Sequence, residues 1–459
     1  MKNLLIIISI FILSLSVYAR DWTVILYTSP DKSEGNCMTE YLKGDLSEMQ
    51  KVDDNFVKFI VESDKWYDLK WKDTGKTDIN GQKIYERADN SVGSWGEHPT
   101  IFDISFGKMT MYKVTDEESG HRDNIVKLIT WAANKYPANY YLLAFDGHGN
   151  GSMGNFGDVK VAELNSTIEK LKIYLKNKLN ISIFNKLKVI SFASCLMNTV
   201  AVNYEVKDGP DYVTGSEHPS LDTHYDKLGK HLPGNSPKNA AFEAVNQLDS
   251  PTASAISLKI LRSNADKSLY SSLTLFVEKI IDADKDDQIK YINALHHVLE
   301  KVQRFDTDWF ELVDLHHFFS LVAKEDGFSD SIKDIAKRII EISKANGEFI
   351  VKNSVKSEFF DSSDKKYLDS MKNANGISIY FPMYKTKNVN GIEGEEDPYN
   401  FNEFKKLQFC KDTKYSWDKL IALYYDIMKN GKAKIEDKTG DSGDALKENA
   451  STFWNSIFN

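Results

Sequence analysis

The sequence predicts an α/β fold, with a mostly parallel sheet flanked by helices and a mainly helical C-terminal region. Between residues 22 and 228, short β-branched and aromatic runs alternate with segments of helical periodicity. From about residue 236 one helical segment follows another, and a single strand is expected at 376–381, before Pro382. Strands separated by helices form βαβ units, so the sheet is expected to be largely parallel and covered on both faces.

The elements are predicted in order from these patterns. Strands are expected at residues 22–27, 57–61, 140–145, 187–192 and 212–215. Between them, helices are expected at 122–135, which Pro137 ends, at 164–175 and at 196–206. The stretch 65–96 is irregular and polar, with a hairpin signal at Asn80-Gly81. Later helices are predicted at 240–248, 269–281, 288–302, 331–346 and 417–428.

Length and charge limit the organisation and the partners. The 459 residues allow two or three domains. We divide them into a signal peptide (1–19), an α/β domain (20–235), a mainly helical region with one added strand (236–429) and a polar tail (430–459). Asp and Glu number 67 against 58 Lys and Arg, a net charge of -9, so nucleic acid is not an expected partner.

The first residues have the features of a secretory signal. A positive start at Lys2 is followed by an apolar run over residues 4–17 and by Val17-Tyr18-Ala19. This pattern predicts cleavage near Ala19 and export to the periplasm, the cell surface or the medium, with no stable membrane span afterwards. An uncleaved anchor is the open alternative, because residues 4–19 are nearly long enough to span a bilayer.

The chain has three cysteines: Cys37, Cys195 and Cys410. Either Cys37 and Cys410 form a bridge and leave one thiol free, or all three are free. A leftover cysteine in an exported protein is a candidate reactive thiol. The alternative is a buried core residue, which free cysteine often is.

Two strand ends carry the candidate catalytic groups. His148 follows the strand predicted at 140–145, and Cys195 follows the strand predicted at 187–192. The carboxyl ends of neighbouring parallel strands share one edge of a sheet, where ligands bind. There an imidazole can deprotonate a thiol and protonate a leaving amine. We also expect Cys195 to begin a helix, whose N-terminus would favour the thiolate. The alternative is a structural histidine and a packed cysteine.

Around these residues the chain resembles the clostripain family of cysteine peptidases. Residues 140–149, ending in Asp-Gly-His-Gly, and residues 191–198, with Ala-Ser-Cys-Leu-Met, match its motifs, and the likeness extends over roughly residues 22–430. The resemblance implies a caspase-like fold, with 20–235 as the catalytic domain, and an exported endopeptidase acting on peptide or protein substrates. Cys195 would be the nucleophile and His148 the general acid/base, with the N–H groups of Gly149 and Cys195 as the oxyanion hole.

One position departs from the family pattern. Two residues before the nucleophile the family usually has an aspartate that selects a basic P1 residue, and this chain has Ala193. Loss of that carboxylate predicts an altered or relaxed P1 preference. Asp222, or less strongly Glu217, falls where a second acid of the pocket is expected.

Other signals are weaker. Residues 149–154 fit G-x-G-x-x-G, but no helix opens within the glycines. The acidic run from Asp282 lacks the glycine and the final glutamate of a calcium-binding loop. We therefore predict no metal site and no required cofactor, although some relatives respond to calcium and a calcium dependence with unassigned ligands is left open. Two rival functions also stay open: a catalytically weak or inactive homologue acting as an exported binding or scaffold protein, and a membrane-anchored surface protein.

Overall fold

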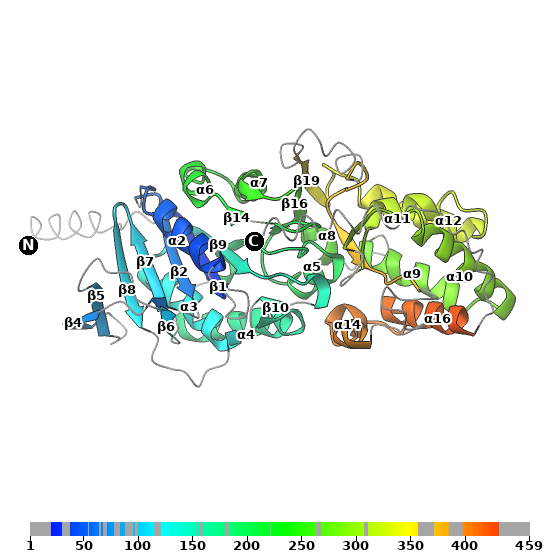
Figure 1. The fold of residues 1–459 in the computed structure, drawn as a ribbon, viewed down its shortest axis with the longest axis horizontal. Coiled ribbons are helices and arrows are strands. Elements are labelled where there is room, and N and C mark those ends of the chain that lie inside the picture. Colours follow the sequence, from blue (N-terminus) through cyan, green and yellow to red (C-terminus); the bar gives the residue numbers. More distant parts are fainter. Residues whose placement is uncertain are drawn as a thin grey trace, which may run out of the picture.

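The structure is a computed structural model, and it describes most of the chain between residues 20 and 430. The described residues are 20–29, 37–53, 55–63, 66–67, 71–77, 83–87, 95–96, 100–113, 121–153, 155–156, 159–179, 183–220, 222–262, 268–306, 311–356, 371–384 and 398–430. The molecule is elongated, with the α/β part at one end and a helical part at the other (Figure 1). The predicted signal peptide and nearly all of the predicted tail lie outside the described residues.

One large sheet forms the α/β part. Within the described residues its order is β19-β16-β13-β12-β9-β1-β2-β7-β8-β5-β4. The strands are β1 (Arg20–Ser29), β2 (Val57–Ser63), β4 (Trp71–Thr77), β5 (Lys83–Arg87), β7 (Thr100–Ser105), β8 (Lys108–Lys113), β9 (Ala138–Gly147), β12 (Leu187–Phe192), β13 (Tyr212–Gly215), β16 (Thr252–Ser257) and β19 (Ile350–Val355). The five central strands, from β13 to β2, are parallel, and antiparallel strands extend the sheet on both sides. The predicted α/β fold is confirmed.

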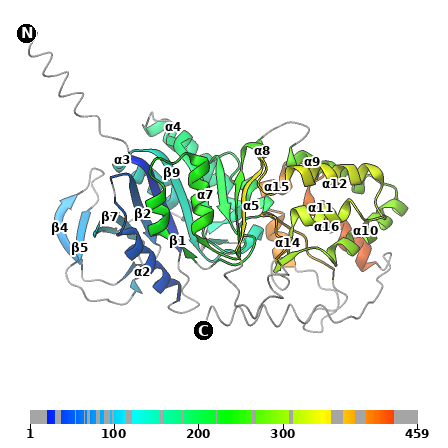
Figure 2. The same cartoon turned by 90° about the horizontal axis from the view of Figure 1, so that it is seen from above.

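Helices cover both faces of this sheet (Figure 2). One face carries α2 (Cys37–Met49), α6 (Tyr225–His231) and α7 (Pro237–Gln247). The other carries α3 (His121–Lys135), α4 (Val161–Leu179) and α5 (Val200–Glu205). Side chains alternate along a strand, so Leu142 and Ala144 of β9 pack under the first set, and Leu143 and Phe145 under the second.

The helical part packs around aromatic side chains. Its helices are α8 (Lys259–Arg262), α9 (Leu269–Ile281), α10 (Lys285–Leu299), α11 (Leu315–Val322), α12 (Asp330–Ile342), α14 (Pro398–Phe404), α15 (Gln408–Lys411) and α16 (Trp417–Lys429). The Trp417 ring contacts Phe276, Phe318 and Phe381, and its N–H donates to the carbonyl of Tyr380 at 2.8 Å. These residues belong to the same apolar cluster as Phe145, so the helical part shares a core with one face of the sheet. Among the described helices, none has the length and apolar character needed to cross a membrane.

The region after residue 235 contains more strands than the sequence predicted. Besides β20 (Ser378–Tyr380), which lies in the expected segment 376–381, it holds β15 (Leu248–Asp249), β16, β17 (Arg304–Asp306), β18 (Leu312–Asp314) and β19. The prediction of one added strand is therefore wrong. Pairing of β16 with β13, and of β19 with β16, carries the main sheet beyond the predicted boundary.

The stretch 65–96 is more regular than expected. β4 and β5 pair in antiparallel fashion on either side of Asn80-Gly81, as the hairpin signal predicts. The remaining short elements, here and elsewhere, are β3 (Trp66–Tyr67), β6 (Trp95–Gly96), β10 (Asn155–Phe156), β11 (Val159–Lys160), β14 (Asp222–Thr223) and the 3-10 turns η1 (Gly151–Met153) and η2 (Ile183–Lys186).

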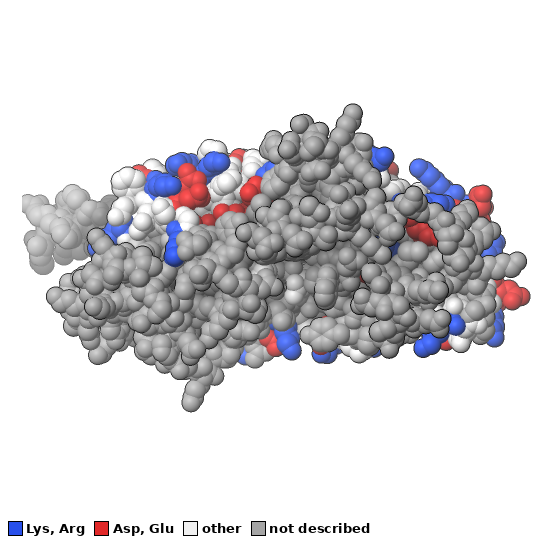
Figure 3. Space-filling view, in the orientation of Figure 1, with Lys and Arg blue, Asp and Glu red and all other residues white. Residues whose placement is uncertain are grey.

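Charged side chains lie on the outer surface of α6. Acidic and basic groups intermix on the described surface near α2 and α6 (Figure 3). Lys230 pairs with Asp226 one turn away at 2.8 Å, and His231 Nδ1 lies 3.2 Å from Glu243 of α7. These pairs are largely exposed, so each contributes little to stability.

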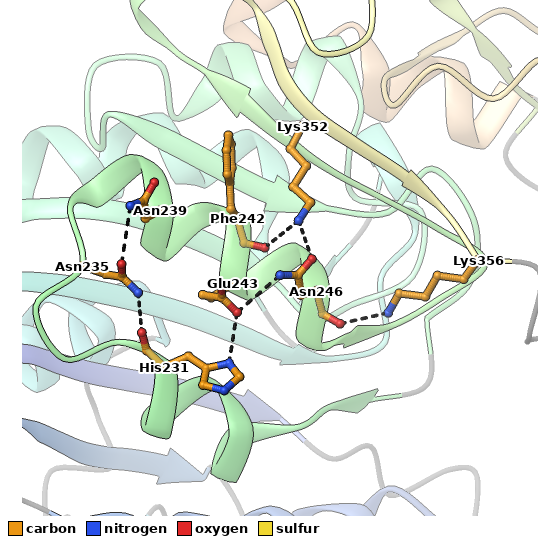
Figure 4. A network of polar contacts seen from close by, with 8 residues as sticks. All are labelled: His231, Asn235, Asn239, Phe242, Glu243, Asn246, Lys352 and Lys356. Atoms are coloured by element: carbon orange, nitrogen blue, oxygen red, sulfur yellow. Dashed lines mark hydrogen bonds and ion pairs between the residues drawn. The ribbon is translucent and has the colours of Figure 1, made fainter.

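Two lysines of the edge strand hold the carboxyl end of α7 (Figure 4). Lys352 donates to the carbonyl of Phe242 at 3.5 Å and to the side chain of Asn246. Lys356 donates to the carbonyl of Asn246 at 3.2 Å and to that of Leu248. Cations are favourable at the carboxyl end of a helix, so these contacts tie β19 to the helix that covers it.

A buried ion network supports the other side of the sheet. Lys58 of β2 is 1% exposed, and its Nζ lies 2.8 Å from Asp103 Oδ1 and 2.6 Å from Ser105 Oγ. Lys135 lies 2.9 Å from Asp103 Oδ2, and the Tyr136 hydroxyl donates to the same oxygen. Burial by itself raises the pKa of Asp103. The charge of Lys58 and the hydrogen bonds outweigh it, so this pKa lies below its ordinary value.

We predict that Asp103→Asn lowers the free energy of unfolding by about 3 kcal/mol at pH 7, because it removes the carboxylate that pairs with the buried Lys58 and with Lys135. The folded-state pKa of Asp103 is depressed, so its stabilising effect is present above the unfolded pKa of about 4 and is lost as the pH falls through the folded value. Urea unfolding at pH 7 and pH 3 should show the difference from wild type shrinking at the lower pH. Asp334→Asn, which removes an exposed pair with Lys337, is the control and should change little. A difference that stays constant with pH would contradict the assignment.

Candidate active site

The pairing of β9 with β12 places the two predicted catalytic residues at the same edge of the sheet. Phe192 pairs with Phe145 in this parallel ladder, and the N–H of Ala193 donates to the carbonyl of Phe145 at 2.8 Å. His148 and Cys195 each follow their strand's phenylalanine by three positions. They therefore leave equivalent points of neighbouring strands at the carboxyl end, as the sequence predicts.

Gly149 brings the two segments into contact. A Cβ atom placed on this glycine would lie 2.2 Å from the carbonyl oxygen of Cys195 and 2.8 Å from Ser194 Cβ. Real Cβ atoms do not approach that closely, so the main chain beside His148 packs against the main chain of Cys195. Both His148 and Cys195 are half-buried.

The predicted helix after Cys195 begins later than expected. Leu196 has φ of 63°, which is left-handed backbone that ends any helical path from Cys195. The helix α5 starts at Val200, and the Thr199 side chain caps it by accepting the N–H of Val202. The prediction that Cys195 lies at a helix N-terminus is therefore wrong, and no helix dipole stabilises its thiolate.

The thiol of Cys195 contacts one residue of the neighbouring loop at two points. The thiol donates to the carbonyl of Ser220 at 3.4 Å, and the N–H of Ser220 donates to Sγ at 3.4 Å. Burial raises the pKa of the thiol to about 11, the contacts with Ser220 oppose this, and the charge of Asp146 adds to it. At neutral pH Cys195 is therefore a thiol, and a base has to remove its proton before it can attack.

Three aspartates form an acidic cluster near Cys195: Asp45 of α2, Asp146 of β9 and Asp222 of β14. Asp45 is 1% exposed, and burial together with the charges of Asp146 and Asp222 raises its pKa well above the ordinary value. Burial and the charge of Asp222 raise the pKa of Asp146 to about 7, against a hydrogen bond from the N–H of Gly147. The pKa of Asp222 is also raised, chiefly by burial. Near neutral pH this cluster retains protons.

The predicted pocket residues lie in two places. Ala193 is 3% exposed and packs on the sheet face covered by α2, α6 and α7. It follows Phe192 directly, as Asp146 follows Phe145, the strand partner of Phe192. Asp222 belongs to the acidic cluster. Glu217 lies elsewhere, 1% exposed, with its Oε2 accepting the N–H of Gly376 at 2.8 Å.

Sequence patterns missed Asp45, Asp146 and Ser220. Asp146 stands two residues before His148, and this position beside the histidine motif could have indicated it. Asp45 lies on a helix far away in the sequence, and Ser220 contacts the thiol through its main chain. Neither leaves a local signal.

The structure decides between the two alternatives for the pairing of the cysteines. Cys195 and Cys410 are both free, and Cys410 is buried. The alternative with a Cys37–Cys410 bridge is therefore wrong. Within the described ranges, no three His, Cys, Asp or Glu side chains are grouped as a metal site would require. Calcium dependence stays a prediction without ligands.

Known proteins resemble the chain at the level of family and fold. The family model of the clostripain family matches residues 33–424. No curated protein matches. Iotapain, a secreted C11 cysteine protease from Bacteroides thetaiotaomicron, is 14% identical over 86% of this chain and 99% of its own, with a TM-score of 0.53.

Two other solved structures cover similar shares at lower TM-scores. A secreted C11 cysteine protease from Bacteroides thetaiotaomicron, in complex with an irreversible peptide inhibitor, is 16% identical over 88% of this chain and 99% of its own, with a TM-score of 0.49. An inactive zymogen C11 protease from Parabacteroides distasonis is 14% identical over 86% and 98%, with a TM-score of 0.47. The family match spans most of the sequence, and the fold agrees with that of iotapain. The chain belongs to the clostripain family of cysteine endopeptidases.

Proposed function

We propose that this protein is an exported endopeptidase that hydrolyses peptide bonds through a dyad of Cys195 and His148. The observation that carries the proposal is the packing of Gly149 against the Cys195 main chain, just beyond the carboxyl ends of the paired strands β9 and β12. A histidine and a cysteine held at one sheet edge in this way can exchange a proton and share one substrate.

The dyad would work by nucleophilic catalysis. Because the pKa of the thiol is about 11, His148 acts as a base and takes the thiol proton as Sγ attacks the peptide carbonyl carbon. The carbonyl electron pair moves to oxygen. Collapse of this intermediate breaks the C–N bond, and His148 returns the proton to the leaving amine. Water, deprotonated by His148, then attacks the acyl-enzyme and releases the carboxylic acid and the thiol.

The oxyanion would be bound by the N–H groups of Gly149 and Cys195. Gly149 suits this role because a residue with a side chain would collide with the Cys195 carbonyl, 2.2 Å from the Cβ position. Donors fixed by the main chain stabilise the charge that develops on oxygen without rearranging during the reaction.

The P1 preference is proposed to be altered from basic. Ala193 supplies no charge where the family has an aspartate, and the neighbouring Asp146, with a pKa of about 7, carries less than a full charge at neutral pH. We place Asp222 in the pocket with Ala193. We leave Glu217 out of this pocket, because its buried carboxylate accepts the N–H of Gly376. A pocket with little fixed charge accepts uncharged P1 side chains.

Export is proposed from the N-terminal pattern, and iotapain, which shares the fold, is described as secreted. One rival function has an observation in its favour. The high pKa of the Cys195 thiol and the loss of the pocket aspartate are also expected of a homologue that binds peptides without cleaving them.

Cys195→Ala should lower cleavage of a mixed peptide library by roughly 10³-fold or more, because it removes the nucleophile. Cys410→Ala, which changes a buried thiol in the helical part, should retain the activity and is the matched control. Mass spectrometry of the digests measures both. Absence of cleavage by the unsubstituted protein would favour the binding function.

Ala193→Asp should raise the ratio of cleavage after Arg or Lys to cleavage after apolar residues by about tenfold or more, because it adds a carboxylate to the pocket. Ala193→Asn has nearly the same size without the charge and separates this effect from crowding at a buried position. The library digest gives the P1 residues directly. A wild-type protein that already cleaves only after Arg or Lys would contradict the proposed preference.

The protein recovered after expression in an exporting cell should begin at Arg20. N-terminal sequencing or intact mass measures this, in the medium, the periplasm and the membrane fraction. Recovery of residues 1–19 on a membrane-bound form would instead support the anchored alternative.

A further inference from the structure

The loop at residues 216–220 runs alongside the segment that follows the nucleophile. The N–H of Leu196 donates to the carbonyl of His218 at 3.2 Å, and the N–H of Asn198 donates to that of Ser216 at 2.9 Å. Leu196 is held in left-handed backbone, which is unfavourable for a residue other than glycine. These hydrogen bonds keep the turn after Cys195 in that strained shape.

The same loop also holds the thiol, through the two contacts of Ser220 with Sγ. Residues 216, 218 and 220 therefore all support the nucleophile and its turn. Glu217 lies between two of these supporting residues, and its side chain leads away from the site, to the N–H of Gly376.

Glu217 meets a second buried carboxyl group, that of Asp314. Asp314 Oδ2 accepts the N–H of Asn375 at 2.6 Å, while Glu217 Oε2 accepts the N–H of the next residue, Gly376, at 2.8 Å. Each side chain also alters the pKa of the other, so the two carboxyl groups are neighbours. Glu217 is 1% exposed and Asp314 is not exposed at all.

Two carboxylates in such a place cannot both be charged at low cost, so the pair holds a proton. Burial and the charge of Asp314 raise the pKa of Glu217 well above its ordinary value. Burial raises the pKa of Asp314 to about 7, against hydrogen bonds from His317 and Asn375.

Among the residues that the structure describes, the titratable groups named below do not neutralise the pair. His218, the next residue of the loop, has a pKa lowered to about 4 by burial and is uncharged at neutral pH. The pKa of His317 on α11 is also lowered by burial, and its main-chain N–H donates to Asp314. Lys372, on the segment that carries Asn375, is exposed.

We propose that Glu217 and Asp314 are positioning residues: they share one proton and hold residues 216–220 where Ser220 supports the nucleophile. This inference rests on the proposed function of Cys195. When the shared proton is lost, two buried negative charges repel, and the loop moves away from residues 375–376. A carboxyl group whose folded-state pKa is raised contributes stability at low pH and loses it as the pH rises, so the support fails on the alkaline side.

Glu217→Gln tests the proposal without removing the contacts. The amide can accept from Gly376 through oxygen and donate to the Asp314 carboxylate through nitrogen, with no shared proton. We expect its kcat/KM near pH 6 to stay within about threefold of wild type and the alkaline limb of the pH profile to move up by roughly one pH unit. Glu217→Ala, which removes the contact, should lower kcat about tenfold to a hundredfold at every pH.

Glu205→Gln is the matched control. Glu205, the last residue of α5, is also buried, with a pKa raised to about 7 by burial, and it also accepts a peptide N–H, that of Phe409 in α15 at 3.0 Å. Its pH profile should equal that of wild type. An unchanged alkaline limb in Glu217→Gln, or the same shift in Glu205→Gln, would overturn the proposal.

A second measurement separates this inference from the proposed function. The rate at which iodoacetamide alkylates Cys195, read by mass spectrometry apart from Cys410, needs no peptidase activity. The alkylation rate of any thiol rises with pH as the thiolate forms. In wild type we expect a further rise above about pH 7, because the loop then releases the Cys195 thiol. Glu217→Gln should show no such further rise. Absence of peptide cleavage with this difference present would overturn only the proposed function. Identical alkylation profiles would overturn the role of the pair.

Discussion

The parallel pairing of β9 with β12 is the contact on which the candidate site depends. Phe145 and Phe192 are partners in this ladder, and their rings stack at 5.6 Å on the face shared with the helical part. A shift of one residue would turn every side chain of a strand to the other face, so this buried pair fixes the register strongly. With the register fixed, His148 and Cys195 have to leave the sheet at the same level, and Gly149 is the residue that allows their segments to touch.

The electrostatic surroundings explain how this site can be stable without substrate. The Cys195 thiol, Asp146 and Asp45 all have raised pKa values, with burial as the largest cause in each case. Protonated groups at neutral pH avoid the cost of several buried charges in one place. A protonated thiol also agrees with the start of α5 at Val200, which lies beyond Cys195.

Strands and helices that depend on local sequence patterns could be predicted from the sequence. Features of the site that depend on contacts between distant segments could not. Strands at 187–192 and 212–215 and the helix at 269–281 have the predicted bounds, because apolar runs and periodicity determine them. The start of α5 was missed because the hydrogen bonds to the loop at 216–220 force Leu196 into left-handed backbone against its own preference. Asp45 and Asp314 had no local signal, because burial in the folded protein is the main cause of their raised pKa values. The carboxyl groups that interact most with them also lie more than 90 positions away in the sequence.

The C-terminal region takes part in the same support. Asn198 donates through Nδ2 to the carbonyl of Gly376 at 3.0 Å, and its own carbonyl accepts the N–H of Ser378 at 3.0 Å. Gly376 has φ of 108°, and a Cβ there would lie 2.9 Å from Ser254 Cβ, so the close approach of this segment requires glycine. The segment that binds Glu217 is thus also bonded to the turn that follows Cys195. Because Glu217 and the turn after Cys195 both form hydrogen bonds with residues 376–378, the C-terminal region contributes directly to the structure of the candidate site.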